Sequence, residues 1–235
     1  MGLLLRAPRL HWSFVATRPW SNLSRRNMSL TPKIISTSEL SAQDAKWITL
    51  QKIKYSDAEG KERVWECAER KTRKSTGVDA VAVMALIKSK TNAFPASTVI
   101  IEQFRPPIGK YIIEFPAGLI DEGDTVESAA TRELEEETGF KADSVQDVSD
   151  LTVVDPGMTN ANMKFVIANV TLEDKLTKPK QKLEAGEFIV TRVVELSKLH
   201  EELKEYAKKD FVVDARLSHF AMGFNLANQM QKKSV

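Results

Sequence analysis

Short apolar runs separated by turn-forming residues predict a chain that is rich in β-strands. The first two runs flank Asp57-Ala-Glu-Gly-Lys61 and predict a hairpin with a glycine-containing loop. The later runs are short, rich in β-branched residues and bounded by turn residues, as strands are. The predicted strands cover residues 46–56, 62–70, 80–87, 98–101, 111–115, about 148–154, 164–170 and 187–194.

Apolar positions that recur near a 3.6-residue period predict three helices. The first follows a Gly/Asp turn, where Asp124 or Thr125 can cap it, and Gly139 suits its C-terminus. Two more helices close the chain, the last with Asp214 available as its cap. Strands and helices are interspersed without a regular βαβ rhythm, so we expect an α/β fold with a mixed sheet flanked by helices. The apolar stripes of the three helices are Val126, Ala129, Ala130 and Leu134; Leu196, Leu199, Leu203 and Tyr206; and Leu217, Phe220, Ala221, Phe224 and Ala227.

The composition excludes several classes of protein. A chain of 235 residues suits one substantial domain with extensions. Its 34 basic and 32 acidic residues leave a net charge of +2, which gives no general argument for nucleic-acid binding. No run approaches the roughly 20 apolar residues of a transmembrane helix, so no membrane partner is expected. The single cysteine, Cys67, excludes an intramolecular disulfide and is expected to be a small buried residue. The three histidines show no metal-ligand spacing.

The first segment, about residues 1–35, has a composition of its own. No Asp or Glu precedes Glu39, whereas arginines, serines and threonines are frequent. This composition is typical of a mitochondrial transit peptide, and the alternative is a basic tail without an address. Met28 offers a second start, which would give a form without this segment in the cytoplasm or nucleus.

The first predicted helix has an acidic face. Glu133 and Glu137 lie four residues apart on one side of it, with Glu136 beside them. Like charges at this spacing weaken a helix by about 0.2–0.5 kcal/mol per pair. A bound divalent cation would reverse that penalty, because hard cations such as Mg²⁺ take carboxylate oxygens. An acidic face that is merely solvated is the alternative.

The acids belong to a longer pattern, which resembles the Nudix box: Gly, five residues, Glu, seven residues, Arg-Glu, a bulky apolar residue, one residue, Glu-Glu, one residue, Gly, a bulky apolar residue. Asp124 stands where that family usually has Glu, and Phe140 where it usually has an aliphatic residue. The shorter carboxylate of Asp124 leaves open whether its charge pair forms. The positions in register are Gly118, Arg132, Glu133, Leu134, Glu136, Glu137 and Gly139.

Segments outside the box resemble the ADP-ribose pyrophosphatase branch of that family, from about Trp47 to Asn228. In that branch a proline follows the box at about the distance of Pro156 from Phe140. The resemblance implies an α/β/α sandwich for residues 78–235 and a small β domain for residues 36–77 at a dimer interface. The segments are Arg63–Cys67, Glu102–Pro107, Glu114–Asp121, Asp155–Gly157, Gly186–Phe188 and Val213–Arg216.

The resemblance also implies a metal site and a catalytic acid. Glu133 and Glu137 would bind Mg²⁺, or Mn²⁺ in its place, with Glu136 bridging and the backbone carbonyl of Ala117 completing the site. Arg132 would orient an acid of the same helix, and its alternative is an exposed ion pair with Glu136. Glu187 is the implied catalytic glutamate, because a glycine-bearing loop can move and position the attacking water. Glu184 is its local competitor.

Substrate-binding roles follow from the same resemblance. Arg70 and Arg105 would bind the diphosphate, since guanidinium groups match phosphate oxygens; the alternative is that both are surface arginines. Trp47 and Trp65 would sandwich adenine, one from each subunit of a homodimer, although tryptophans on strands are more often core residues. Glu66 would lie beside the base. Further substrate contacts are Leu119 and Asp155.

Together these features predict a Mg²⁺-dependent hydrolase that cleaves ADP-ribose, and related ADP-sugars, to AMP and ribose 5-phosphate. The alternatives are hydrolysis of another nucleoside diphosphate derivative, such as an oxidised nucleotide or NADH, and a non-catalytic ADP-ribose sensor. A nucleic-acid decapping role is disfavoured, because no basic stripe accompanies the box.

Overall fold

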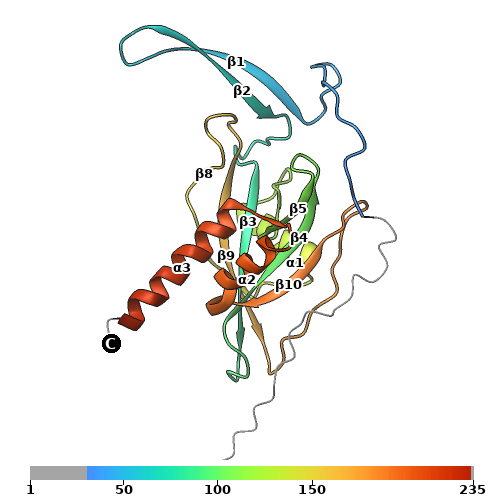
Figure 1. Cartoon of the computed structure of the whole chain (residues 1–235), viewed down its shortest axis with the longest axis vertical. Coiled ribbons are helices and arrows are strands. Elements are labelled where there is room, and N and C mark those ends of the chain that lie inside the picture. Colours follow the sequence, from blue (N-terminus) through green and yellow to red (C-terminus); the bar gives the residue numbers. More distant parts are fainter. Residues whose placement is uncertain (1–30, 234–235) are drawn as a thin grey trace, which may run out of the picture. The chain divides into compact units, whose positions relative to one another are not determined.

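The apolar run that begins at Ala80 forms the central strand of a mixed sheet in the computed structural model, which describes residues 31–233 (Figure 1). The predicted transit peptide and Met28 lie outside the described residues. From Ile34 onward the described chain forms one unit. Its strands are β1 (Ile48–Ser56), β2 (Glu62–Arg70), β3 (Ala80–Ser89), β4 (Ser97–Arg105), β5 (Lys110–Glu114), β6 (Ala117–Leu119), β7 (Ser144–Val148), β8 (Thr152–Val153), β9 (Asn162–Leu172), β10 (Val190–Glu195) and β11 (Val212–Val213). Its helices are α1 (Val126–Thr138), the 3₁₀ turn η1 (Leu196–Lys198), α2 (Leu199–Ala207) and α3 (Ala215–Lys233).

The predicted hairpin is confirmed as a two-stranded antiparallel ribbon of β1 and β2. Asp57 closes its loop, because its carboxylate accepts hydrogen bonds from the backbone N–H groups of Glu59 and Lys61, both at 2.9 Å. Gly60 has a φ of +79°, a conformation that favours glycine. The ribbon carries the predicted substrate-binding residues Trp65, Glu66 and Arg70, which are far from the acidic helix in the sequence.

The main sheet has the order β11-β5-β4-β3-β9-β7, with β10 added on β4, β6 on β3 and β8 on β9. The pairs β3–β9 and β5–β11 are parallel, whereas the other pairs are antiparallel. The expected mixed sheet is therefore confirmed.

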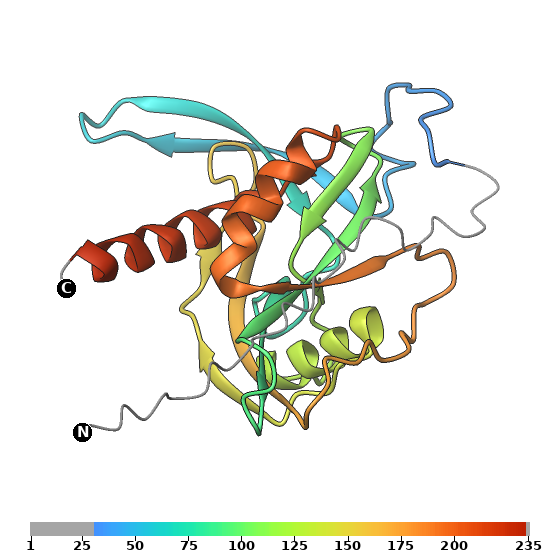
Figure 2. The same cartoon turned by 60° about the horizontal axis from the view of Figure 1, so that its bottom comes forward.

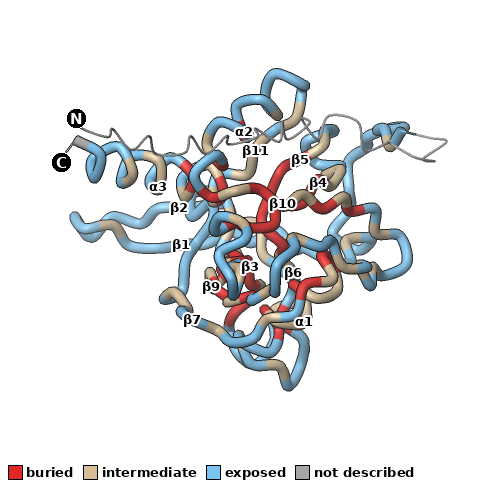
Figure 3. Tube along the Cα trace, turned by 90° about the horizontal axis from the view of Figure 1, so that it is seen from below, coloured by how far each residue is buried: buried red, intermediate tan, exposed pale blue. Residues whose placement is uncertain are grey.

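Helices cover both faces of this sheet (Figure 2). The buried stripe of α1 packs with Val81 and Val83 of β3 on one face, while Leu203 of α2 and Leu217 of α3 pack with Ile100 on the other. Figure 3 shows buried residues concentrated in the central strands and along the inner side of α1. These layers are those of an α/β/α sandwich. Among the described residues, no helix has the length and apolar character needed to cross a membrane.

Several details differ from the expected elements. The run at 148–154 is split between β7, which already begins at Ser144, and β8, because residues 149–151 leave the strand. The short strands β6 and β11 were not predicted, since two or three residues show no periodicity. β6 pairs with β3, and β11 pairs with β5 through Val212 and Val213.

The hairpin is joined to the sheet through a buried carboxylate at the start of β3. Asp79 is only 4% exposed. Its oxygens accept from Arg73 Nε at 2.9 Å, Arg73 Nη2 at 2.7 Å and the N–H of Asn162 at 3.0 Å. Arg73 belongs to the segment that follows β2, and Asn162 begins β9. Asp79 thus ties three parts of the chain together.

Candidate active site

Both ends of α1 are set by local chemistry. Thr125, not Asp124, is the N-cap: its hydroxyl accepts the N–H of Ser128 at 3.1 Å, and Ser128 Oγ accepts the N–H of Thr125 at 2.9 Å. Gly139 ends the helix with a φ of +78° and donates its N–H to Glu135 O at 2.8 Å. These caps fix the residues that α1 turns toward the sheet.

Glu137 is a carboxyl group buried between α1 and β6. It is 4% exposed, and its Oε2 accepts the N–H of Ala117 at 2.9 Å. Burial raises the pKa of Glu137 to about 8, with the charges of Glu133, Glu187 and Glu114 adding to the effect and the bond from Ala117 opposing it. A cation beside this group would favour its charged form.

Glu133 lies directly against the glycine that opens the box. A Cβ on Gly118 would come within 1.9 Å of the Glu133 carboxyl carbon, so no other residue fits there without moving that side chain. Burial raises the pKa of Glu133, Arg132 opposes this shift, and the charges of Glu136 and Glu187 add to it. Glycine at position 118 therefore leaves room for the carboxylate of Glu133.

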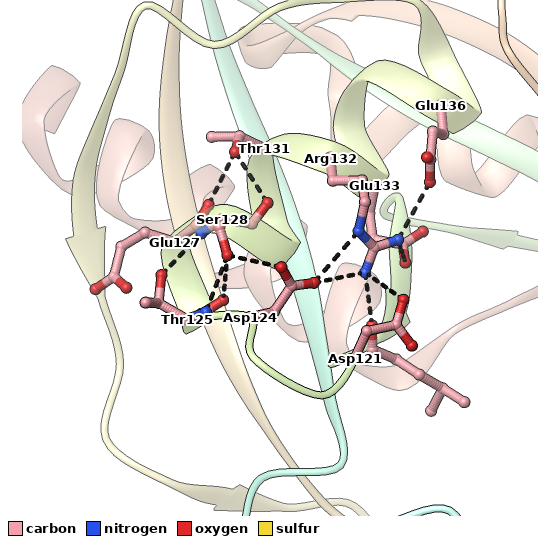
Figure 4. A network of polar contacts seen from close by, with 10 residues as sticks. Asp121, Asp124, Thr125, Glu127, Ser128, Thr131, Arg132, Glu133 and Glu136 are labelled. Carbon is pink, nitrogen blue, oxygen red and sulfur yellow. Dashed lines mark hydrogen bonds and ion pairs between the residues drawn. The ribbon is translucent and has the colours of Figure 1, made fainter. Parts of the chain in front are cut away.

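Arg132 organises the exposed side of the cluster (Figure 4). It reaches Asp124 at 3.1 Å, Glu133 at 2.8 Å, Glu136 at 3.2 Å and the carbonyl oxygen of Leu119 at 3.1 Å. The shorter carboxylate of Asp124 thus still makes a charge pair. The ion pair with Glu136 also forms, as one of several contacts.

The donor set suits a hard divalent cation. In the structure its carboxylates bind protein donors, and within the described part of the chain no group of three His, Cys, Asp or Glu side chains is arranged to hold a metal ion. The donors are nevertheless all oxygen, and two of the acids carry raised pKa values that a nearby cation would offset. Glu133, Glu136 and Glu137 are the residues that would hold it. The role of the Ala117 carbonyl stays a prediction; it is the N–H of this residue that contacts Glu137.

Glu187 lies in the loop before β10, within electrostatic range of Glu133 and Glu137. Its Oε2 accepts the N–H of Glu184 at 3.0 Å. Glu187 is half-buried and its charge raises the pKa of both Glu133 and Glu137, whereas Glu184 is exposed. Of the two acids, Glu187 therefore faces the cluster on α1.

Arg105 is connected to the cluster through an acid that was given no role from the sequence. Its Nε donates to Glu114 Oε1 at 2.8 Å, and Glu114, on β5, is only 3% exposed. The charge of Glu114 also reaches Glu137. Arg216 approaches the second oxygen of Glu114 at 3.9 Å. Glu114 belongs to a segment that resembles the ADP-ribose pyrophosphatase branch, so the sequence singled out this residue but did not predict its pairing with Arg105.

The remaining predicted residues lie on the hairpin and on the loop that contacts it. Trp47 is 70% exposed and Trp65 is 49% exposed, with Trp65 Nε1 donating to the Gly157 carbonyl at 2.9 Å. Asp155 begins that loop and accepts the N–H of Thr159 through its main-chain oxygen at 2.9 Å. The two other predicted residues on the hairpin are Glu66, which pairs with Lys52, and Arg70, which pairs with Ile48, and both are exposed.

The two tryptophans are far apart along the ribbon. Trp65 of β2 pairs with Ile53 of β1, and Trp47 lies just before β1, six residues before Ile53, where its carbonyl accepts the N–H of Lys71 at 3.0 Å. Six residues of extended chain span about 20 Å. Within one chain the two rings therefore cannot enclose a single base.

The structure thus brings together the predicted residues of α1, Ala117, Leu119 and Glu187, and it leaves the hairpin residues apart from them.

Comparison with known proteins identifies the family of the chain. Residues 80–215 match the NUDIX domain family model, which covers more than half of the chain. The chain therefore belongs to the Nudix hydrolase family.

Relatives resemble the chain over most of its length. It is 41% identical to the ADP-ribose pyrophosphatase of Saccharomyces cerevisiae, over 81% of this chain and 82% of that protein. It is 35% identical to the ADP-sugar pyrophosphatase of Mus musculus, over 83% and 89%. An uncharacterized Nudix hydrolase of Schizosaccharomyces pombe is 45% identical over 83% and 93%. A crystal structure of an ADP compounds hydrolase shares the fold, with a TM-score of 0.56, 21% identity and coverage of 88% of this chain and 98% of that one.

Proposed function

We propose that the chain hydrolyses the diphosphate of ADP-ribose and related ADP-sugars to AMP and a sugar phosphate, which is ribose 5-phosphate for ADP-ribose, with Mg²⁺ as its cofactor and Mn²⁺ as a substitute. The observation that carries the proposal is the pair of half-buried Glu133 and buried Glu137 on one face of α1, with Glu187 within electrostatic range of both. The substrate class is supported by the names of the yeast and mouse relatives.

In this proposal the acids of α1, with the Ala117 carbonyl, hold the cation. When bound, Mg²⁺ supplies charge neutralisation at the diphosphate and lowers the pKa of water. Arg132 holds Glu133 and Glu136 in place through its charged hydrogen bonds. Glu187 orients the attacking water and accepts its proton. Arg105, held by Glu114, and Arg70 bind the phosphate oxygens through their guanidinium groups.

Adenine recognition requires a second copy of the chain. The tryptophans of one ribbon stand about 20 Å apart, so a base stacked on both must take one from each subunit of a homodimer. Glu66 would then bind the edge of the base, with Leu119 and Asp155 as further contacts. Exposed apolar residues along the ribbon, which a partner would cover, support the dimer: Trp47, Ile48, Leu50, Ile53, Val64 and Trp65.

The mitochondrial address is a further proposal, supported by the acid-free, arginine-rich start. A fluorescent fusion of residues 1–35 should enter mitochondria, and a chain that starts at Met28 should remain outside and keep its activity. A fusion that stays diffuse would sink the proposal.

A hydrolysis screen tests the activity. ADP-ribose, ADP-glucose, NADH and 8-oxo-dGDP are incubated with the chain and Mg²⁺, with and without a chelator. We expect the highest kcat/KM for an ADP-sugar and no turnover with the chelator. A preference for NADH or the oxidised nucleotide would instead support the other nucleotide class, and binding of ADP-ribose without any turnover would support a sensor.

A further inference from the structure

One side-chain amide closes the loop that carries Glu187. Gln181 Nε2 donates to the carbonyl of Glu137 at 2.6 Å and to the carbonyl of Ile189 at 3.0 Å. The Glu137 carbonyl lies in the last turn of α1, where carbonyls have no partner within the helix. Ile189 immediately precedes β10. The two hydrogens of one amide thus connect both ends of the loop to the acidic helix.

Backbone contacts hold the same end of the loop against α1. The N–H of Lys182 donates to Glu136 O at 2.8 Å. A Cβ on Gly139 would come within 2.6 Å of Lys180 O, so the glycine that ends α1 also makes room for this segment. The segment before Glu187 is therefore aligned with the last turn of the helix.

Between these anchors, the hydrogen bonds that the structure describes for residues 184–187 lie within the loop itself. The N–H of Glu187 donates to Glu184 O at 3.2 Å, and Glu187 Oε2 accepts the N–H of Glu184 at 3.0 Å. Glu184, Ala185 and Gly186 are exposed, and Gly186 has a φ of +93°. These local bonds shape the loop, so the position of Glu187 relative to α1 depends on where the two ends of the loop are held.

We infer that Gln181 is a positioning residue, which sets where Glu187 stands relative to the acids of α1 by joining both ends of its loop to the carbonyl of Glu137. The inference rests on the proposed function, in which Glu187 acts on the attacking water. Glu137 supplies both a buried carboxyl group and the carbonyl that Gln181 binds. The loop is thereby anchored to Glu137, which is itself one of the proposed ligands of the cation.

The first test is Gln181→Met, which keeps the length of the side chain and removes its donors. We expect kcat on ADP-ribose to fall about tenfold to a hundredfold, because a misplacement of 1 Å can cost about a hundredfold, with KM and the Mg²⁺ dependence changed less than about threefold. Lys182→Met is the matched control, since it removes only the exposed ion pair with Glu135, at 2.5 Å, and should leave kcat unchanged. If Gln181→Met does not fold, Gln181→Ala replaces it, because water can then reach both carbonyls.

The second test asks whether Gln181 acts through Glu187. In a Glu187→Gln background, the added Gln181→Met change should lower kcat by less than about twofold, since residues that act as a unit are non-additive. A full multiplicative loss in that background would overturn the inference, because Gln181 would then act on the helix.

A third readout does not depend on turnover. Hydrogen exchange of a peptide covering residues 182–188 should be faster in Gln181→Met than in the wild type, with exchange in α1 unchanged. Unchanged exchange in the loop would contradict the tether even if kcat fell. A wild-type chain that turned over none of the four substrates would instead overturn the proposed function and the role of Glu187, while faster loop exchange in the variant would still establish the tether itself.

Discussion

At the scale of single residues, the site is shaped by how closely groups approach one another. Glu133 occupies space that a side chain at position 118 would need, and Glu137 is buried with a raised pKa of about 8. Space and burial, rather than charge alone, make these acids different from an acidic helix face that is merely solvated.

Gly118→Ala should displace Glu133, because the added methyl group would meet its carboxylate. Little stability should be lost, because the atoms that the methyl group meets are at the far end of a flexible side chain, which can move. Turnover at limiting Mg²⁺ should fall more than the melting temperature explains. Gly223→Ala on α3 is the matched control, since a Cβ there meets nothing within 4 Å, and it should keep full activity. Wild-type turnover in Gly118→Ala would show that Glu133 need not stay where it is.

Glu137→Gln should abolish most turnover and leave the fold intact. The variant loses a charge that would hold the cation, while the cost of burying that charge disappears, so the melting temperature without metal should not fall. Activity and thermal unfolding on one preparation check both statements. Near wild-type turnover at limiting Mg²⁺ would rule out Glu137 as a ligand.

At the scale of elements, features that depend on neighbouring residues could be predicted from the sequence, whereas features that depend on contacts between distant residues could not. The ends of α1 follow from Thr125 and Gly139, which act on their own neighbours, and the hairpin follows from its glycine-containing loop. The strand β11 was missed because only its pairing with β5 makes it a strand. The role of Gln181 was missed for the same reason, since Glu137 lies 44 residues away in the sequence.

The junction at Asp79 gives stability that depends on pH. Burial would raise the pKa of Asp79, but hydrogen bonds from Arg73 and from the N–H of Asn162 outweigh it and lower the pKa. A group whose pKa is lowered on folding contributes stability above its unfolded value, about 3.9, and this contribution is lost as the pH falls through the folded pKa.

Asp79→Asn should therefore lower the free energy of unfolding at pH 7 by about 1.5–3 kcal/mol, the range for hydrogen bonds to charged groups. The difference from the wild type should shrink below about pH 4, where the unfolded Asp is itself protonated. Urea unfolding at both pH values measures this, with Glu173→Gln, which removes an exposed ion pair with Lys90, as the control. An equal loss at both pH values would mean that the charge of Asp79 is not what stabilises the junction.

At the scale of the whole molecule, the hairpin and the acidic helix divide the proposed work between binding and chemistry. Trp65→Ala should cost about 1–3 kcal/mol of substrate binding, the range for stacking a base on an aromatic ring. The loss should appear mainly as a rise in KM of roughly fivefold to over a hundredfold, because the groups that carry the chemistry are untouched. A lower melting temperature with an unchanged KM would mean that Trp65 is structural and that the base binds elsewhere.

The wide spacing of Trp47 and Trp65 has a consequence for how tightly the substrate is held. If one base needs a ring from each of two chains, its apparent affinity varies with protein concentration, because dilution separates the two halves of its binding site. By mass action, the substrate must in turn shift the equilibrium between monomer and dimer toward the dimer. The size of the shift is set by how much more tightly the dimer binds the substrate than the monomer does. Substrate would then act as a cross-link between two copies of the protein, and a dilute solution would bind it more weakly than a concentrated one.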